Sequence, residues 1–170
     1  MNKLKAITMF AAAIVLSACG RQQAAESPAE SLKAHLKELV NQGEIMFGHQ
    51  DSYLYGHSWK VEKDATQFDR SDIRDVTGRY PALYGMDLGG IELDSPLNID
   101  KNDFNHMRAA AVAHHERGGV ITFSWHPRNP LTGGDTWDTQ SAEVVASILP
   151  GGEKHEMFMG WLSKAADYLG

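Results

Sequence analysis

The amino-acid sequence predicts an α/β fold in which about three β/α units share one parallel β-sheet. The main observation is the run Val-Ile-Thr-Phe-Ser-Trp at 120–125, which is apolar or β-branched almost throughout, as in a strand buried on both faces. Two further runs, at 45–47 and 81–87, have a similar character and also lead into Gly-containing loops. Segments with helical periodicity lie between and after these runs. Strands that alternate with helices favour βαβ connections and parallel pairing.

The N-terminus is predicted to hold a lipoprotein signal, a tether and a helix. Residues 1–18 have a basic start and a short apolar stretch, and the Leu-Ser-Ala-Cys at 16–19 resembles the bacterial lipoprotein signal, in which Cys19 carries lipid. The alternative is an ordinary secretory signal with a chance cysteine. Residues 19–30 are polar and alanine-rich, as in a tether. A helix is predicted over 31–41, with Leu32, Leu36 and Val40 on one face and Gly43 beyond its end.

A long loop and a short helix are predicted between the first two strands. The segment 52–68 mixes polar and aromatic residues without a clear period, so it is interpreted as a loop. Its aromatic side chains form either a small loop core or part of a binding surface. They are Tyr53, Tyr55 and Trp59. Ser71 can cap a short helix that runs to Val76, and Gly78 is its stop.

Three helices are predicted in the second half of the chain. The first covers 103–117, and either Asp100 or Asn102 can cap it. Its buried stripe is expected to hold Met107, Ala110, Ala111 and His114. The segment 141–149 is interpreted as a second helix, and 153–169 as an amphipathic third helix. The inward residues expected on the third helix are Met157, Phe158, Trp161, Leu162, Ala165 and Leu169.

Composition narrows the classes of function. Removal of residues 1–18 leaves 152 of the 170 residues, which is enough for one domain over 31–170 with its own core. The net charge of −6 argues against a nucleic-acid partner, because phosphates call for a basic surface. The eight histidines show no spacing typical of metal ligands, so no metal or cofactor is expected. The same absence argues against a metal-dependent polysaccharide deacetylase.

Chemically useful side chains follow the strand at 120–125. His126 comes directly after it, and Asp135 and Trp137 lie in the Pro- and Gly-rich loop beyond. Polar and aromatic groups at the end of a parallel strand are typical of a binding site in α/β enzymes. A tryptophan offers a flat apolar face, and histidine and aspartate offer hydrogen bonds. This combination suits a sugar ring, which has apolar C–H faces and a polar rim.

Residues 45 to about 137 resemble family 26 of the glycoside hydrolases, whose main activity is endo-β-1,4-mannanase. The matching motifs are Phe47-Gly48-His49-Gln50-Asp51, Ser71-Asp72-Ile73, Val76-Thr77-Gly78-Arg79-Tyr80-Pro81, Tyr84-Gly85-Met86-Asp87-Leu88-Gly89, Asn98-Ile99-Asp100, Ser124-Trp125-His126, Asn129-Pro130 and Gly133-Gly134. Each motif is weak alone, but their joint order is specific. The resemblance implies the N-terminal portion of a (β/α)8 TIM barrel that degrades β-1,4-mannan with retention of configuration.

The resemblance also implies roles for five residues. His126 would lie beside the sugar at the cleavage point, Trp137 would stack on it, and Asp135 would bind a hydroxyl. His49 and Asp87 would line the floor of the site. Each has a structural alternative: His126 as a strand cap, Trp137 packed on its loop, and Asp135 as a turn cap. His49 and Asp87 could instead form hydrogen bonds inside the barrel without touching a ligand.

The catalytic pair of the family is expected to be absent from this chain. Retaining glycosidases use two carboxylates about 5 Å apart. In the family these are glutamates at the fourth and seventh barrel strands, the first within Arg-Pro-x-x-His-Glu, and the sequence ends before either. The pair His155-Glu156 lacks that context and is interpreted as helix surface. The 170-residue chain alone is therefore expected to be inactive.

The expected location is the bacterial cell envelope, held by lipid at Cys19, with the outer membrane favoured. The alternative function is a non-catalytic surface lipoprotein that binds glycans through His126 and Trp137.

Overall fold

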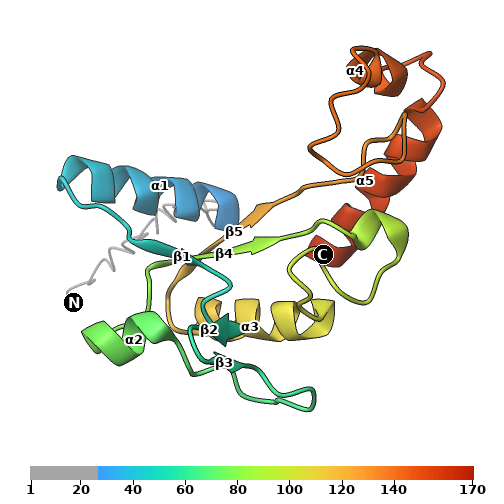
Figure 1. The fold of residues 1–170 in the computed structure, drawn as a ribbon. Helices are drawn as coiled ribbons and strands as arrows, with labels where there is room; N and C mark the ends of the chain where they lie inside the picture. Colours follow the sequence, from blue (N-terminus) through green and yellow to red (C-terminus); the bar gives the residue numbers. More distant parts are fainter. Residues whose placement is uncertain (1–26) are drawn as a thin grey trace, which may run out of the picture. The chain divides into compact units, whose positions relative to one another are not determined.

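A computed structural model describes residues 27–170 (Figure 1). The chain divides into two compact units, residues 1–44 and 45–170, and each is described by itself. The predicted signal at 1–18, Cys19 and most of the predicted tether lie outside the described residues. Within residues 27–170, no helix combines the length and apolar character needed to cross a membrane.

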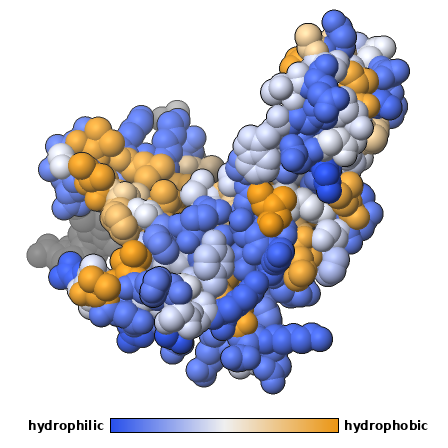
Figure 2. Space-filling model, in the orientation of Figure 1, coloured by the Kyte–Doolittle hydropathy of each residue, from blue (hydrophilic) through white to orange (hydrophobic). Residues whose placement is uncertain are grey.

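The described part of the first unit contains helix α1 (Pro28–Asn41). The helix begins three residues before the predicted start at 31, because Ser27 accepts a hydrogen bond from the Glu30 amide (3.3 Å) and Pro28 suits the first turn. Gly43 follows the helix with a φ of +71°, which confirms its role as the stop. Figure 2 shows hydrophobic surface over α1, where the predicted stripe of Leu32, Leu36 and Val40 is exposed.

The second unit is built on a three-stranded parallel sheet in the order β1-β4-β5. Its strands are β1 (Gly48–Gln50), β4 (Leu83–Asp87) and β5 (Val120–Ser124). Figure 1 shows β4 between its two neighbours. The parallel α/β organisation is therefore confirmed. The first strand was wrongly predicted at 45–47, because its ladder starts only where Gly48 meets Leu83 at the beginning of β4.

Strand β5 differs from the prediction in its burial. Ile121 and Phe123 pack against the core, but Thr122 and Ser124 on the other face are exposed. Among the described residues β5 is an edge strand, and elements are packed against only one of its faces. The prediction of burial on both faces is wrong for this reason. The alternation itself is that of a strand with one covered face.

The core lies between the sheet, helix α3 (Phe104–Glu116) and the loop after β1. Its buried apolar members are Tyr53, Leu54, Phe68, Tyr84, Met86, Leu88, Phe104, Met107, Ala110 and Ala165. The stripe predicted on α3 is thus confirmed. Asp103 caps this helix through the Asn105 and His106 amides (2.8 and 3.3 Å), so the predicted caps at Asp100 and Asn102 were wrong.

The loop over 52–68 contains a small antiparallel hairpin of β2 (Tyr55–Gly56) and β3 (Trp59–Lys60). Tyr53 in this loop is a core residue, and its hydroxyl forms a hydrogen bond of 2.8 Å with His114 Nδ1. The short helix α2 (Asp72–Thr77) has the predicted cap at Ser71 and the predicted stop at Gly78, whose φ is +75°. Beyond β4 the chain forms one turn of 3-10 helix, η1 (Ile91–Leu93).

Two helices follow β5: α4 (Val144–Ile148) and α5 (His155–Leu169). Helix α5 packs Phe158, Trp161 and Ala165 inward, as predicted. Met157, Leu162 and Leu169 are exposed, contrary to the prediction. Tyr168 takes the inward position instead, with its ring 5.3 Å from Phe104 and 6.3 Å from Phe123.

Candidate functional site

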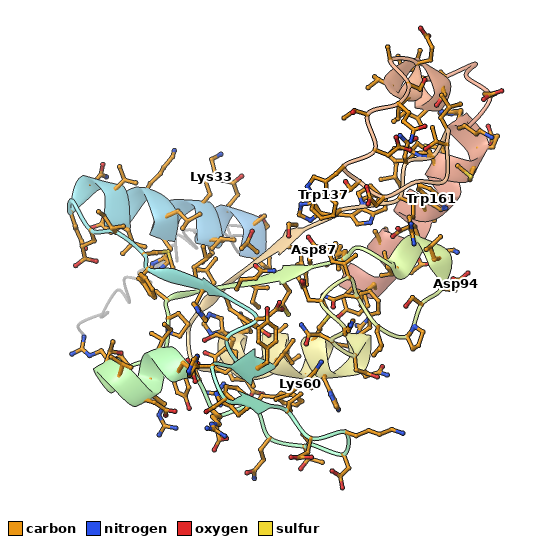
Figure 3. All side chains as sticks on the ribbon, viewed as in Figure 1. Lys33, Lys60, Asp87, Asp94, Trp137 and Trp161 are labelled. Atoms are coloured by element: carbon orange, nitrogen blue, oxygen red, sulfur yellow. The ribbon has the colours of Figure 1, made fainter. Side chains whose placement is uncertain are left out.

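The ends of β4 and β5 bring two of the predicted site residues together. Asp87 is the last residue of β4, and it pairs in register with Ser124, the last residue of β5. His126 follows two residues later. Because parallel strands end at the same edge of a sheet, both side chains reach one region. Figure 3 labels Asp87 in this region.

Asp87 and His126 form a close pair, with 2.5 Å between Asp87 Oδ2 and His126 Nδ1. A carboxylate only accepts hydrogen bonds, so Nδ1 carries the proton that is donated to Asp87, and Nε2 is turned away from Asp87. Asp87 is 2% exposed, whereas the His126 side chain is 44% exposed. The geometry leaves the imidazole accessible with a defined tautomer.

Further hydrogen bonds hold the Asp87 carboxylate. Oδ2 accepts from the Ser124 hydroxyl (2.6 Å), and Oδ1 accepts from the Gly89 amide (2.7 Å) and the His126 amide (3.3 Å). Burial by itself raises the pKa of Asp87, but the bonds from Ser124, Gly89 and His126 together lower this pKa below its ordinary value. Asp87 is therefore ionised and fixed.

Trp137 covers one face of the imidazole. The two rings are nearly parallel, with 18° between their planes and 5.6 Å between their centroids. Trp137 is 69% exposed, so its indole presents a large apolar surface outward. Asp135 accepts a hydrogen bond from the Trp137 amide (3.0 Å), which is the turn cap considered from the sequence, and Asp135 is also exposed.

His126, Asp135 and Trp137 line a common hollow of about 430 Å³. The loop after β4 supplies the facing wall, which includes Leu97 and Ile99. The hollow thus combines apolar side chains and an indole with an imidazole and a carboxylate. Figure 3 labels Trp137 on the loop that follows β5.

His49 is not brought to this hollow. It pairs with Tyr84 across β1 and β4, and Tyr84 is a core residue that packs against Tyr53. Paired residues share a face of the sheet, and Asp87, three positions after Tyr84, lies on the opposite face. His49 Nδ1 is buried and has no hydrogen-bond partner. His49 and Asp87 therefore do not form one floor.

Two residues that were not predicted from the sequence support the site. Asn98 donates a hydrogen bond to the Asp87 carbonyl (3.0 Å), and its own side-chain oxygen accepts from the Asp100 and Asn102 amides (3.0 and 2.9 Å). Glu92 is buried in η1 and binds groups on both sides of His126. The spacing Asn-x-Asp-x-Asn was a signal for a side-chain-stabilised turn, but no local pattern marked Glu92.

A third missed residue is Asp51, which is fully buried just after β1. Burial, followed by repulsion from Asp100, raises its pKa to about 7, although a hydrogen bond from the Tyr55 hydroxyl (3.4 Å) acts in the opposite direction. Its Oδ1 has no partner. Asp51 is therefore a buried carboxyl with a raised pKa, close to the end of the sheet that carries the site.

Neither a metal cluster nor the pair His155-Glu156 contributes to the site. Across residues 27–170, no group of three or more His, Cys, Asp or Glu side chains is placed to hold a metal ion. Glu156 is exposed in the first turn of α5, as the sequence predicted.

Residues 22–170 match the family model of Glycosyl hydrolase family 26. The chain belongs to this family. Over 136 residues it is 31% identical to a mannan endo-1,4-beta-mannosidase of Bifidobacterium adolescentis, a match that covers 75% of this chain and 12% of that protein. The family assignment made from the motifs is thus confirmed.

Solved structures of family 26 show the same fold. A beta-mannanase from Bacteroides ovatus is 40% identical, with a TM-score of 0.76 over 85% of this chain and 40% of its own. The catalytic domain of an endo-beta-1,4-mannanase from Bacillus sp. JAMB-750 is 33% identical, with a TM-score of 0.67 over 82% of this chain and 36% of its own. These relatives are (β/α)8 barrels, so the family 26 chain forms part of a TIM barrel. It spans less than half the length of each of these relatives.

Proposed function

We propose that this chain provides part of the carbohydrate site of a retaining endo-β-1,4-mannanase. The observation that carries the proposal is the accessible His126–Trp137 stack on the hollow, with Asp87 fixing the imidazole. The indole can stack on the apolar face of a mannose ring, and the fixed hydrogen-bonding groups can bind its polar rim. The mannanase relatives support mannan as the substrate.

Loss of the Trp137 indole is expected to weaken binding of mannan oligosaccharides. Trp137→Ala removes the largest exposed apolar surface of the hollow. An aromatic anchor of this kind is worth about 1.4 kcal/mol or more, which is about tenfold in affinity. Isothermal titration with mannohexaose measures the difference. Trp137→Phe keeps a flat face and should retain most of the affinity, whereas equal binding by the wild type and Trp137→Ala would contradict the proposed site.

The 170-residue polypeptide alone is proposed to hydrolyse no mannan. Two carboxylates about 5 Å apart are required for retention. At the hollow, Glu92 accepts hydrogen bonds from three N–H groups and Asp135 holds the Trp137 turn. Both carboxylates are occupied by these hydrogen bonds, and loss of acid/base catalysis alone costs about 10² to 10⁴ in rate. A reducing-sugar assay on mannan tests this, and measurable turnover by the purified chain would refute it.

We also propose that lipid at Cys19 anchors the protein in the bacterial cell envelope, at the outer membrane. The support is the Leu-Ser-Ala-Cys sequence behind a basic and apolar leader. Cells that express the wild type should incorporate labelled palmitate into the protein, and Cys19→Ser should abolish the label. Label retained by the Cys19→Ser protein would show that the lipid is attached to another residue.

A further inference from the structure

The Glu92 carboxylate joins two loops at the hollow. Glu92 lies in η1, in the loop after β4, and is 3% exposed. Its Oε2 accepts hydrogen bonds from the Gly90 amide (2.9 Å) and from the Trp125 indole N–H (3.2 Å). Its Oε1 accepts from the Arg128 amide (3.0 Å). One buried side chain thus binds its own loop and two points of the loop after β5.

These two points lie on either side of His126. Trp125 precedes the histidine, and Arg128 follows it after a single proline. All three groups that bind Glu92 are N–H donors, and a carboxylate has two oxygens that only accept. A glutamine at this position would turn an NH₂ group toward at least one of these donors. The position therefore calls for a side chain with two accepting oxygens rather than any polar side chain.

Helix α5 also contacts the loop that carries Glu92 and the segment that carries Trp125. Lys164 donates hydrogen bonds to the Glu92 carbonyl (2.9 Å) and to Asp94 Oδ2 (2.6 Å). Trp125 stacks on Phe158 of α5, with 13° between the ring planes. The Glu92 backbone is thus held by the helix while its side chain holds the segment that carries His126. Displacement of Glu92 would move the two walls of the hollow relative to each other.

We propose that Glu92 is a positioning residue for the carbohydrate site, a role that rests on the proposed function. It keeps His126 and the wall formed by the loop after β4 at the separation that a mannose ring requires. It acts through the Trp125 indole and the Arg128 amide and does not itself react. Pre-formed sites of this kind depend on supporting hydrogen bonds, because a small displacement of the binding groups costs much of the affinity.

The test compares Glu92→Gln with Glu156→Gln in the full chain. Glu156 is exposed on α5, so the second variant makes the same chemical change without touching the hollow. Mannohexaose affinity by isothermal titration is expected to fall at least tenfold in Glu92→Gln and to stay unchanged in Glu156→Gln. The ¹⁵N resonances of the His126 ring, the Trp125 indole and the Arg128 amide are expected to move only in Glu92→Gln. A purely structural role would lower the melting temperature but leave the affinity of the folded protein unchanged.

Trp125→Phe is the second variant, in case Glu92→Gln fails to fold. It removes one donor to Glu92 and keeps an aromatic ring against Phe158. A loss of affinity in the same direction supports the proposal. If the wild type binds mannohexaose and the folded Glu92→Gln and Trp125→Phe variants bind it equally well, the role of Glu92 is overturned while the proposed function stands. If the wild type binds no mannohexaose, the proposed function fails, and the role of Glu92 fails with it.

Discussion

Asp87→Ala is expected to lower the free energy of unfolding by about 3 kcal/mol near neutral pH, because it removes a buried carboxylate that accepts several hydrogen bonds. The carboxylate is buried and accepts hydrogen bonds from Ser124, Gly89 and His126. Its removal leaves these donors without their acceptor. The destabilisation is not larger because the His126 side chain reaches solvent and can be hydrated.

The cost of Asp87→Ala should depend on pH in a defined direction. The pKa of Asp87 in the folded chain is below its ordinary value of 3.8. A carboxyl with a lowered pKa stabilises the folded state above the unfolded pKa, and this contribution is lost as the pH falls through the folded pKa. The difference between wild type and variant should therefore be larger at about pH 7 than at about pH 2.5.

Urea unfolding at these two pH values measures the effect, with Asp64→Ala as the matched control. Asp64 is exposed in the loop after β3, so its replacement should change the free energy of unfolding by less than about 0.5 kcal/mol. A destabilisation by Asp87→Ala that stayed constant down to the lower pH would show that ionisation of the Asp87 carboxyl does not contribute to it. The same variant should also lose mannohexaose affinity, because the His126 tautomer is no longer set.

The parts of the fold that were predicted correctly have local causes. The helix α2 could be located from Ser71 and Gly78, because a cap and a stop act within one turn of the helix. The strands β4 and β5 were found from short apolar runs. The stripe on α3 followed from helical spacing, since Met107, Ala110 and His114 are buried as expected.

The parts that were missed depend on pairing between distant residues. The position of β1 is set by the register in which Gly48 meets Leu83, and that same register turns His49 away from the face of Asp87. One residue of register exchanges the two faces of a strand, and no local pattern reports it. The inward place of Tyr168 on α5 likewise depends on Phe104 and Phe123 from other elements.

The candidate site was predicted where its residues are close in sequence and missed where they are not. His126, Asp135 and Trp137 lie within one strand end and its loop, and the structure places them on one hollow. Glu92 was missed because its partners Trp125 and Arg128 are more than thirty residues away. The raised pKa of Asp51 has the same origin, since it depends on burial and on the distant Asp100.

Asp51→Asn is expected to stabilise the chain, and only at the higher pH values. The pKa of Asp51 is about 7 in the folded chain, against an ordinary value of 3.8. Between these values the unfolded chain loses the proton that the folded chain keeps, so the free energy of unfolding of the wild type falls as the pH rises from about 4 to about 7. Asparagine carries no ionisable proton, and the variant lacks this fall.

The gain in Asp51→Asn at about pH 8 should be about 2 to 3 kcal/mol, below the roughly 4 kcal/mol of the full shift, because the asparagine amide buries one more N–H donor than the protonated carboxyl. Asparagine tolerates the left-handed backbone of this position, where φ is +51°, and its oxygen can still accept from Tyr55. Urea unfolding between about pH 4 and about pH 8 measures the difference, with Asp64→Asn as the exposed control. Parallel stability curves for the wild type and Asp51→Asn would show that the Asp51 carboxyl ionises at its ordinary pKa. The contribution of Asp87 is lost only at more acidic pH. The effects of Asp51 and Asp87 on the free energy of unfolding can therefore be distinguished by measuring that free energy as a function of pH.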